Sequence, residues 1–451
     1  MAARPIIIGG GISGLAAAYE FDRASLRPLV IEQRGSLGGV IRTEEVEGCS
    51  LEAGPDSFLA AKPAGFELIK EIGLGDDVIG SNDHQRVTYL VRHNRLIPMP
   101  DGLMMMVPTK VLPIALSPLL GWGTKIRMGL DYFRKPPAAP LPDRTVAEFI
   151  REHYGQETVL YLADPLLSGV YGGTADALSV NSVLPRFVEL ERKYGSLTRG
   201  VLAARRLRGG GENGPLFRTL KGGLQQLIDR LSPSADPLYQ RAEAVERIEN
   251  GYRVRVSGDW LETSRLVIAT PAWAAGELLR SVDAVAASDL ESVQYSSSIT
   301  LALVYDKSVC GPIPPGFGFL VPRPERKLLV ACTFVGAKFN SRVAPGKMVL
   351  RCFLGGFGNE AVLDRSDEEI LEGVHQELEA LLGWRAKPLA VRLARWRKAM
   401  AQYTVGHSQR VARIQERLKS LPGLALAGNA YDGIGIPDCI RLGRQAAKAL
   451  I

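Results

Sequence analysis

The stretch that decides the fold reads PIIIGGGISGLAAAYEFDRASLRPLVIE and covers residues 5–32. Three β-branched residues lead into a glycine turn, a run of good helix formers follows, and a second apolar run ends at Glu32. This order predicts a strand, a tight turn, a helix and a second, parallel strand. In the spacing Gly9-x-Gly11-x-x-Gly14 the first glycine turns the chain, the second lets a pyrophosphate approach, and the third lets the helix pack closely.

The same turn predicts a dinucleotide site. The first N–H groups of the helix, at Ile12 and Ser13, lie at its positive end, where a pyrophosphate binds. Glu32 ends the second strand near the offset of about 20 residues expected for a carboxylate that takes a ribose hydroxyl. The alternative is a plain strand–turn–helix connection without a ligand.

Residues 34–43, RGSLGGVIRT, indicate which dinucleotide cofactor the site binds. Two adjacent glycines let the backbone skirt a large ligand, and the two arginines complement phosphates. The alternative is a hairpin with solvated arginines. The run resembles the second fingerprint of flavoproteins of the amine-oxidase superfamily.

The amino-acid composition limits the class of protein and the kinds of ligand that this chain can have. A chain of 451 residues with 46% apolar and 23% charged residues is an ordinary globular protein that should hold two or three lobes. The net charge of +7 suits an anionic small molecule, an acidic membrane surface or nucleic acid. Nucleic acid is least supported, because no basic run or binding module is present.

The cysteines and histidines predict neither disulfides nor a metal site. The five cysteines are scattered without a C-x-x-C pair, and the five histidines lack metal-ligand spacing. We therefore expect a reducing cytoplasm and no metal. The nucleotide strand begins almost at the first residue, so we expect no signal peptide.

Residues 99–135 are apolar, interrupted by prolines and flanked by Lys110, Lys125 and Arg127. No run reaches the roughly 18 apolar residues of a membrane span. Such a patch can lie in a bilayer interface or line a ligand mouth, and the alternative is a helical subdomain that buries these faces itself. We favour a ligand mouth with weak membrane contact.

The middle of the chain mixes helices and strands. Residues 134–142 predict a proline-rich surface linker. Three or four helices are expected between 145 and 207, interrupted at 166–173, where the glycines should open the backbone. Gly209-Gly210-Gly211 should end the helical region. Short strands at 242–248, 253–256 and 266–270 should return to the first lobe. Segments 295–305, 318–321, 328–334 and 348–354 predict a mainly antiparallel sheet.

The chain ends as it begins. Residues 424–427 predict a strand, 428–437 read GNAYDGIGIP, and a helix follows to residue 450. A second strand–glycine–helix unit suits the pyrimidine end of a flavin, because a helix N-terminus stabilises negative charge on the reduced ring.

Several blocks in order resemble the FAD-dependent porphyrinogen oxidases of haem biosynthesis, which oxidise protoporphyrinogen IX or coproporphyrinogen III. The resemblance rests on residues 9–15, 38–43, 54–59, 166–173 with 178–179, 220–223, 402–407 and 428–439.

The resemblance implies an α/β fold, α+β overall: a Rossmann-like FAD domain built from both termini, a substrate domain with a mixed sheet, and an inserted helical domain. The FAD domain is expected at 1–61, 214–282 and 397–451, the substrate domain at 62–98 and 283–396, and the helical domain, which often touches membrane, at 99–213.

The resemblance also implies the chemistry: an oxygen-dependent, six-electron oxidation in three cycles, with release of hydrogen peroxide. In each cycle a methylene-bridge carbon gives hydride to the flavin N5 and a pyrrole N–H loses a proton, so no catalytic residue is assigned. Covalent relatives carry a cysteine where this chain has Asp432 and Gly433, and Cys439 lies beyond them. We therefore expect non-covalent FAD.

The implied site residues fall into two groups. Thr270-Pro271 looks like the family's strand end over the nucleotide, and the backbone of Val245 is expected beside the adenine. The cofactor set is Gly9, Gly11, Ile12, Ser13, Gly14, Glu32, Gln33, Arg34, Gly38, Gly39, Arg42, Gly54, Pro55, Asp56, Val245, Thr270, Gly428, Asn429, Gly433, Ile434 and Ile436. The substrate pocket is Gly169, Tyr171, Phe317, Gly318 and Leu320.

Two points stay open in the substrate site. Phe317 and Leu320 are equally compatible with an ordinary core, and Lys62, Arg86 and Arg92 are candidates for binding substrate carboxylates or solvated charges. Some family members carry an arginine where this chain has Asp56, and the Gly-Pro-Asp-Ser-Phe form looks like the bacterial branch that includes coproporphyrinogen oxidases. This does not decide between the two porphyrinogens.

Two other functions stay open, an FAD amine or polyamine oxidase and a flavin-binding redox partner or scaffold without oxidase turnover. The expected partners are an anionic tetrapyrrole, ferrochelatase or a membrane surface, and a second copy of the chain, without nucleic acid. The expected location is the cytoplasm, with peripheral contact at the cytoplasmic face of the membrane.

Overall fold

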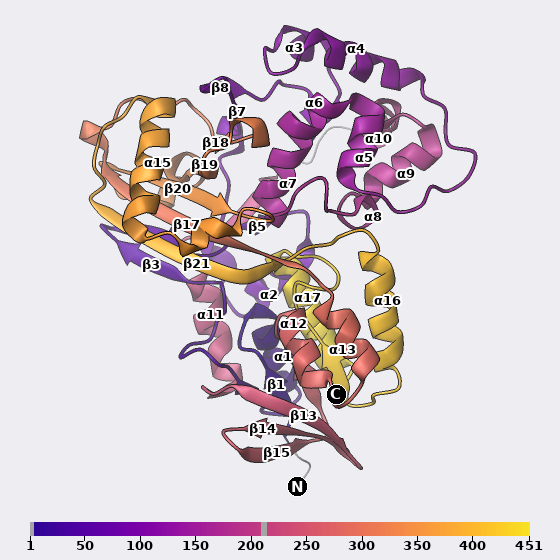
Figure 1. The fold of residues 1–451 in the computed structure, drawn as a ribbon. Helices are drawn as coiled ribbons and strands as arrows, with labels where there is room; N and C mark the ends of the chain where they lie inside the picture. The colour runs from indigo at the N-terminus through magenta and orange to yellow at the C-terminus, as the bar shows by residue number, and fades with distance from the viewer. Residues whose placement is uncertain (1–3, 209–213) are drawn as a thin grey trace.

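A five-stranded parallel sheet brings together the two ends and the middle of the chain (Figure 1). The computed structural model describes residues 4–208 and 214–451. The strands, in their order across the sheet, are β12 (Asp236–Leu238), β2 (Leu29–Ile31), β1 (Ile6–Ile8), β16 (Leu266–Ile268) and β22 (Leu424–Leu426). Strands β1, β2 and β16 are apolar and buried throughout, as strands covered on both faces must be.

Helices cover one face of this sheet. Ile7, Val30 and Val267 pack against a layer of four helices: α1 (Ile12–Arg23), α2 (Pro63–Glu71), α11 (Gln225–Leu231) and α17 (Ile436–Lys448). Helices α1 and α17 are in such close contact that a Cβ on Gly443 would lie 2.1 Å from the Ser13 carbonyl oxygen. The first and last helices of the chain therefore form one packed pair.

A three-stranded antiparallel sheet packs against the other face through Val245, Tyr252 and Val254. Its strands are β13 (Ala242–Ile248), β14 (Gly251–Val256) and β15 (Asp259–Thr263). The strands predicted at 242–248 and 253–256 do return to this lobe, but they pair with each other and with β15. Only β16 of the three predicted strands joins the parallel sheet.

The second large sheet has seven strands in mixed orientation. In order they are β21 (Ala390–Ala401), β17 (Tyr295–Asp306), β20 (Lys347–Gly355), β19 (Leu329–Phe334), β18 (Gly318–Leu320), β7 (Thr88–Arg92) and β8 (Arg95–Pro98). Only β18 and β7 pair in parallel. Helix α15 (Asp367–Leu382) covers one face, and β4 (Cys49–Glu52), from its hairpin with β3 (Thr43–Val46), packs against the other.

The sequence analysis missed β21, the long edge strand of this sheet. Its apolar residues are interrupted by Arg392, Arg395, Arg397 and Lys398, so no clean period-2 pattern shows. Edge strands commonly carry such charges because they discourage pairing with other chains.

Helices dominate residues 111–208 and lie at the opposite end of the molecule from the parallel sheet (Figure 1). They are α3 (Val111–Leu116), α4 (Trp122–Leu130), α5 (Val146–Tyr154), α6 (Gln156–Thr158), α7 (Asp164–Tyr171), α8 (Val180–Val183), α9 (Pro185–Tyr194) and α10 (Leu197–Arg208), with a short π-helix at Val159–Ala163. No helix in the described ranges is long and apolar enough to cross a membrane.

This segment corrects two predictions. It holds six helices after residue 145 rather than three or four, because Gly155, Gly172, Leu184 and Gly195 each end one. Gly169 lies inside α7, and the backbone opens only at Gly172, which caps that helix at φ 57°. The predicted end at Gly209-Gly210-Gly211 lies outside the described residues.

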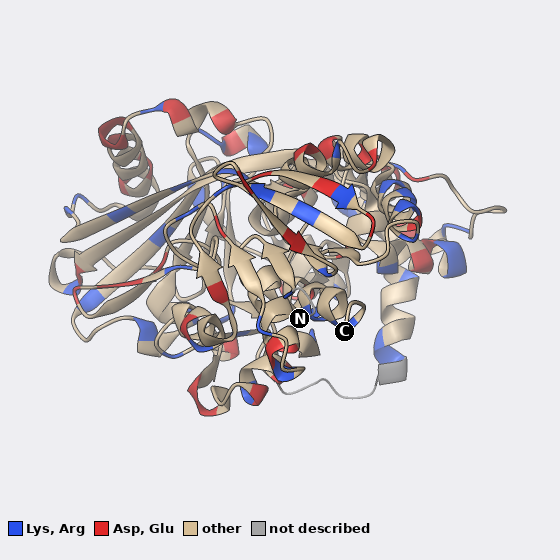
Figure 2. Ribbon diagram, turned by 90° about the horizontal axis from the view of Figure 1, so that it is seen from below, with Lys and Arg blue, Asp and Glu red and all other residues tan. Residues whose placement is uncertain are grey.

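The remaining elements are short and connect the lobes. They are β5 (Phe58–Leu59), β6 (Val78–Gly80) and β11 (Phe217–Leu220) in a small sheet, the β9–β10 hairpin (Leu103–Met104 and Val107–Pro108), and α12 (Ala272–Leu279), α13 (Ala284–Glu291), α14 (Val335–Lys338) and α16 (His407–Leu418). Along the ribbon, Lys and Arg positions are interspersed with Asp and Glu positions (Figure 2). The predicted fold class is confirmed, and the domain boundaries stay a prediction.

Candidate cofactor and substrate site

The three glycines of the first turn have different surroundings. Gly9 leaves β1 at φ 108°, and a Cβ there would lie 2.7 Å from the Ala269 carbonyl oxygen. A Cβ on Gly14 would lie 1.9 Å from the Gly9 carbonyl oxygen, whereas a Cβ on Gly11 would meet no atom within 4 Å. Packing alone therefore requires two of the glycines, and the third faces open space at the N-terminus of α1, where a pyrophosphate fits.

Glu32 closes this turn from the end of β2. Its buried carboxylate accepts hydrogen bonds from the Gly10 N–H (2.7 Å) and the Arg34 N–H (2.8 Å). A carboxylate has about four acceptor positions, so a ribose hydroxyl can still be bound. Gln33 beside it is exposed, and the Val245 side chain is fully buried, so only the backbone of Val245 could meet a ligand.

The second glycine segment lies directly on the first turn. The Gly38 N–H donates to the Gly10 carbonyl (2.8 Å), and a Cβ on Gly39 would lie 3.2 Å from the Gly11 Cα. Both glycines have positive φ, 107° and 63°, which explains why no other residue type suits them. The structure thus brings the two predicted fingerprints together.

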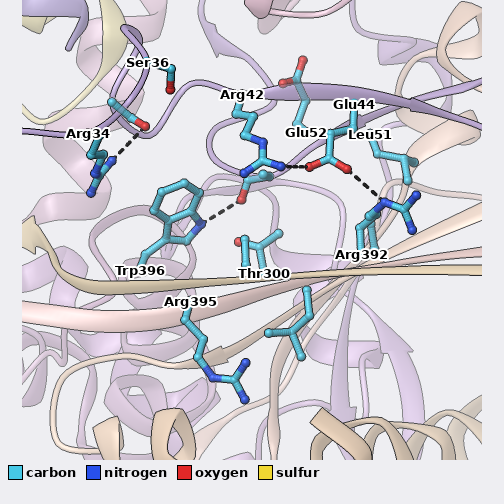
Figure 3. A pocket seen from close by; sticks show the side chains of 15 residues that line it. Arg34, Ser36, Arg42, Glu44, Leu51, Glu52, Thr300, Arg392, Arg395 and Trp396 are labelled. Carbon is cyan, nitrogen blue, oxygen red and sulfur yellow. Dashed lines mark hydrogen bonds and ion pairs between the residues drawn. The ribbon is translucent and has the colours of Figure 1, made fainter. Parts of the chain in front are cut away.

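A cavity of about 440 Å³ adjoins this segment (Figure 3). Arg34, Gly39 and Arg42 line it from one side and Trp396 of β21 from the other, whose indole N–H donates to the Ala53 carbonyl (2.8 Å). Arg42 pairs with Glu44 (2.5 Å), and Glu44 also pairs with Arg392 (2.9 Å). The cavity has the size of a ligand site, and its charged lining is four arginines, Arg34, Arg42, Arg392 and Arg395, against Glu44 and Glu52.

The C-terminal glycine turn meets the first turn at the end of β16. A Cβ on Gly428 would lie 3.6 Å from the Thr270 carbonyl oxygen, next to the Ala269 carbonyl that Gly9 faces. Ile434 precedes the N-terminus of α17, and Ile436 is its first residue. Glycine turns from opposite ends of the chain therefore flank one strand end, at the carboxyl edge of the parallel sheet, where ligands of such sheets bind.

Tyr403 braces this second turn. Its hydroxyl accepts from the Gly433 N–H (2.9 Å) and donates to the Asn429 carbonyl (2.9 Å), and its ring stacks on His407 at 3.9 Å. Burial raises the pKa of Tyr403 far above its usual value, so the hydroxyl stays protonated. Residues 402–407 belong to the family resemblance, but no role was predicted for Tyr403, because its two partners lie 26 and 30 residues further along the chain.

Gly54, Pro55 and Asp56 lie against the second glycine segment. A Cβ on Gly54 would lie 1.7 Å from the Val40 carbonyl oxygen. The Asp56 carboxylate turns toward Lys338 (3.0 Å) and Arg351 (3.6 Å). Burial raises its pKa, but the two cations outweigh burial and hold the pKa well below the usual range.

The predicted substrate residues come from two elements in contact. A Cβ on Gly169 of α7 would lie 3.5 Å from Leu320 of β18, and the Tyr171 ring lies 6.3 Å from that of Tyr403. Burial, with Asp438 nearby, raises the pKa of Tyr171 to about 12. Phe317 is buried, and Gly318 is required by the sheet itself, since a Cβ would lie 2.0 Å from the Cys332 carbonyl oxygen.

The three candidate cations for substrate carboxylates all have carboxylate neighbours. Lys62 pairs with Asp438 (2.5 Å), Arg92 with Glu157 (2.9 Å), and Arg86 lies 3.8 Å from Asp83. Lys62 thus fixes the first turn of α17, and its pairing was not anticipated.

Together, the parallel sheet, the glycine turns at its carboxyl edge and the second sheet beside them define a two-lobed dinucleotide-binding protein. The family model described as "Flavin containing amine oxidoreductase" matches residues 12–451, and the chain belongs to this family. Its cofactor is FAD, as predicted.

Individual relatives match nearly the whole chain. It is 32% identical to a coproporphyrinogen III oxidase of Bacillus subtilis (strain 168), over 98% of this chain and 97% of the relative. It is 27% identical to the chloroplastic protoporphyrinogen oxidase 1 of Arabidopsis thaliana, over 96% and 85%. A putative protoporphyrinogen oxidase from Exiguobacterium sp. superposes with a TM-score of 0.90 at 32% identity, over 100% and 99%.

Proposed function

We propose that this protein is an oxygen-dependent porphyrinogen oxidase of haem biosynthesis, with coproporphyrinogen III as its substrate. The observation that carries the proposal is the similarity, over nearly the full length of both chains, to a bacterial coproporphyrinogen III oxidase. Bacterial relatives named coproporphyrinogen III oxidase match at 30–33% identity, against 27% for the plant protoporphyrinogen oxidase, and this supports the four-carboxylate substrate. The putative protoporphyrinogen oxidase from Exiguobacterium sp. also matches at 32%, so the choice between the two porphyrinogens is decided by the substrate comparison below.

The cofactor would lie across both glycine turns. The open space at Gly11 and the N-terminus of α1 accept the pyrophosphate, Glu32 a ribose hydroxyl, and the Gly428–Gly433 turn the pyrimidine end. When bound, the flavin accepts a hydride equivalent in each of three cycles and passes the electrons to oxygen as hydrogen peroxide.

The protein itself would mainly hold a large apolar macrocycle. Gly169, Tyr171 and Leu320 are adjacent and at least partly exposed, whereas Phe317 and Gly318 are buried behind them in the chain that forms the sheet. Tyr171 stays neutral because burial raises its pKa. None of these residues is assigned as a general base, and the pyrrole proton would pass to solvent. The substrate carboxylates would compete for Arg86, Arg92 and Lys62 with their present partners.

We propose that the FAD is bound without a covalent bond. Cys439 lies inside α17, buried, and burial raises the pKa of its thiol to about 11, so little thiolate forms. Precipitation of the protein with acid should leave all of the flavin in solution, and yellow colour in the pellet would contradict this proposal.

The test of the activity is a comparison of anaerobic flavin bleaching by coproporphyrinogen III, protoporphyrinogen IX and putrescine. We expect the fastest bleaching with coproporphyrinogen III and none with putrescine. Faster bleaching with protoporphyrinogen IX would overturn the choice of substrate. Bleaching by putrescine alone would make the protein an amine oxidase, and an unchanged spectrum with all three would leave a flavin-binding protein without turnover.

We also propose that the helical end contacts an anionic membrane surface from the cytoplasm. Val111, Leu116, Trp122 and Phe133 of this end are at least 69% exposed, and Lys125 lies 4.6 Å from the Trp122 ring. Apolar side chains flanked by cations suit the interface of a bilayer.

Vesicles of phosphatidylglycerol should sediment the protein, and vesicles of phosphatidylcholine should do so less. A Trp122→Ser, Phe133→Ser variant should stay in solution with both. Equal sedimentation of variant and wild type would contradict the proposal. Contact with ferrochelatase and a homodimer stay predictions, for which size-exclusion chromatography with light scattering is the measurement.

A further inference from the structure

Side chains from the seven-stranded sheet hold the segment Glu52–Asp56. Three successive backbone carbonyls accept from them: Glu52 from Arg351 Nε (3.2 Å), Ala53 from Trp396 Nε1 (2.8 Å), and Gly54 from Arg351 Nη2. Beyond the hairpin bonds at Glu52 and Ala53, three successive carbonyls of this segment thus depend on remote side chains for their partners.

Lys338 and Arg351 form the centre of this contact. Both Asp56 oxygens lie 3.0 Å from Lys338 Nζ, which also donates to Ser57 Oγ (3.0 Å) and faces the Phe217 and Phe339 rings at 4.6 and 5.2 Å. The pair is largely buried, and in such surroundings removal of one partner leaves an uncompensated charge.

A second buried pair adjoins the first. Arg342 and Glu52 are each less than 5% exposed and form an ion pair, and Glu52 also accepts from Thr43 Oγ1 and the Leu224 N–H, both at 2.8 Å. In the described part of the chain, the cluster thus has three cations, Lys338, Arg342 and Arg351, against two carboxylates. Burial lowers the pKa of Lys338 and of Arg351, the carboxylate partners raise it, and the neighbouring cations add to the lowering.

The held segment is continuous with the cofactor cradle. Gly54 packs on the Val40 carbonyl, and the neighbouring Gly39 packs on Gly11, with hypothetical Cβ distances of 1.7 and 3.2 Å. Backbone-to-backbone contact therefore runs from Asp56 to the space where the pyrophosphate fits. A displacement of Gly54 must move the second glycine segment or open a gap, since close-packed contacts leave no room between them.

We propose that Asp56, Lys338 and Arg351 are positioning residues that set the Gly54-Pro55 turn against the cofactor cradle, so that retention of the flavin depends on these ion pairs. Asp56 then acts through its ion pairs rather than by touching the flavin. The proposal rests on the flavin site of the proposed function, but not on the identity of the substrate.

The test is the rate at which FAD leaves the holoenzyme, measured as rising flavin fluorescence at a temperature well below unfolding. We expect Asp56→Asn and Lys338→Met each to speed release about tenfold, within the usual range of coupling between sites. The double variant should release no faster than the quicker single variant, because both remove the same pair. Lys338→Arg, which keeps the charge, should recover most of the retention.

A matched control separates positioning from loss of stability. Asp131 is a buried carboxylate in the helical end, bound to His153 (2.6 Å) and Ser196 (2.9 Å). Asp131→Asn should lower the unfolding temperature and leave FAD release unchanged below it. Wild-type release rates in Asp56→Asn and Lys338→Met, additive effects in the double variant, or equal acceleration by Asp131→Asn would each overturn the proposal. A holoenzyme that shows the coupling but does not oxidise porphyrinogens would overturn only the proposed function.

Discussion

Both glycine turns lie at the carboxyl edge of the parallel sheet and are proposed to bind the cofactor, but different contacts hold them. The first turn is held within residues 9–38, by the Glu32 carboxylate at the Gly10 N–H and the Gly38 N–H at the Gly10 carbonyl. The second is held by the Tyr403 hydroxyl, which reaches Asn429 and Gly433, 26 and 30 residues further along the chain, and by Lys62, 376 residues from Asp438. The sequence spans at Glu32 and Tyr403 are similar, so the two turns differ in Lys62, a contact from the other end of the chain that no local pattern predicts.

The largest effect should come from Gly14, where the first turn depends on close packing. A Cβ at Gly14 would lie 1.9 Å from the Gly9 carbonyl oxygen, so Gly14→Ala must displace the backbone of α1 or β1. We expect a loss of about 3 kcal/mol or more in the free energy of unfolding, measured in urea.

Gly123→Ala is the matched control for this change. Gly123 lies in α4, and a Cβ there meets no atom within 4 Å, so alanine should keep or slightly raise the stability. An unfolding free energy of Gly14→Ala equal to that of the wild type would mean that the turn is not packed as described.

Gly11 should behave in the opposite way to Gly14, because a Cβ there meets open space. Gly11→Val is expected to fold and to abolish FAD retention, since its side chain fills the place of the pyrophosphate. The measurements are the ratio of visible to ultraviolet absorbance after gel filtration and the far-ultraviolet circular dichroism. A yellow, active Gly11→Val protein would contradict the assignment.

The contrast between the turns also explains which parts of the structure could be predicted from the sequence. Four strands of the parallel sheet and both glycine turns could be predicted because each has a local cause, an apolar run or a glycine spacing. The family and the FAD followed from several such blocks in order.

What the sequence did not reveal depends on distant partners. Nothing beside Asp56 predicts its pairing with Lys338, and nothing beside Lys62 predicts Asp438. Strand β21 was hidden by its arginines, although it supplies Trp396 to the cavity wall. The placement of these residues is set by how the two sheets pack, which no local pattern records.

His407, which stacks on Tyr403 beside the second turn, should make the stability of the protein depend on pH. Burial lowers the pKa of His407 to about 4, and its Nε2 faces the Tyr431 carbonyl at 3.4 Å. Arg410 opposes the protonated form and Asp143 favours it slightly. Because the unfolded histidine titrates near 6.5, the unfolded state binds more protons between these values. Stability should therefore be full above pH 6.5 and fall by about 3 kcal/mol as the pH drops to 4.

The measurement is the urea-unfolding free energy at several pH values for wild type and His407→Phe, which keeps a ring against Tyr403. The difference between wild type and variant should change with pH only between about 4 and 6.5. An unchanged difference across this window would show that His407 is not buried in its neutral form.

The smallest effect should come from Tyr403→Phe, which keeps the ring stack and removes only the hydroxyl. The Gly433 N–H then loses its acceptor and the Asn429 carbonyl loses a donor. An unpaired buried polar group costs about 1–3 kcal/mol, part of which water entering the turn would offset. We expect a loss of about 1 kcal/mol in stability and a clearly faster release of FAD, because the turn that should hold the pyrimidine end is loosened.

Tyr252→Phe separates these two effects. The Tyr252 hydroxyl donates to the Pro422 carbonyl (3.1 Å), so its removal also deletes a hydroxyl bond, but one in the small antiparallel sheet away from both glycine turns. It should lower stability by a similar amount and leave FAD release at the wild-type rate. If Tyr252→Phe releases FAD as fast as Tyr403→Phe, the second turn is no more dependent on remote side chains than the rest of the lobe, and the contrast between the two turns is wrong.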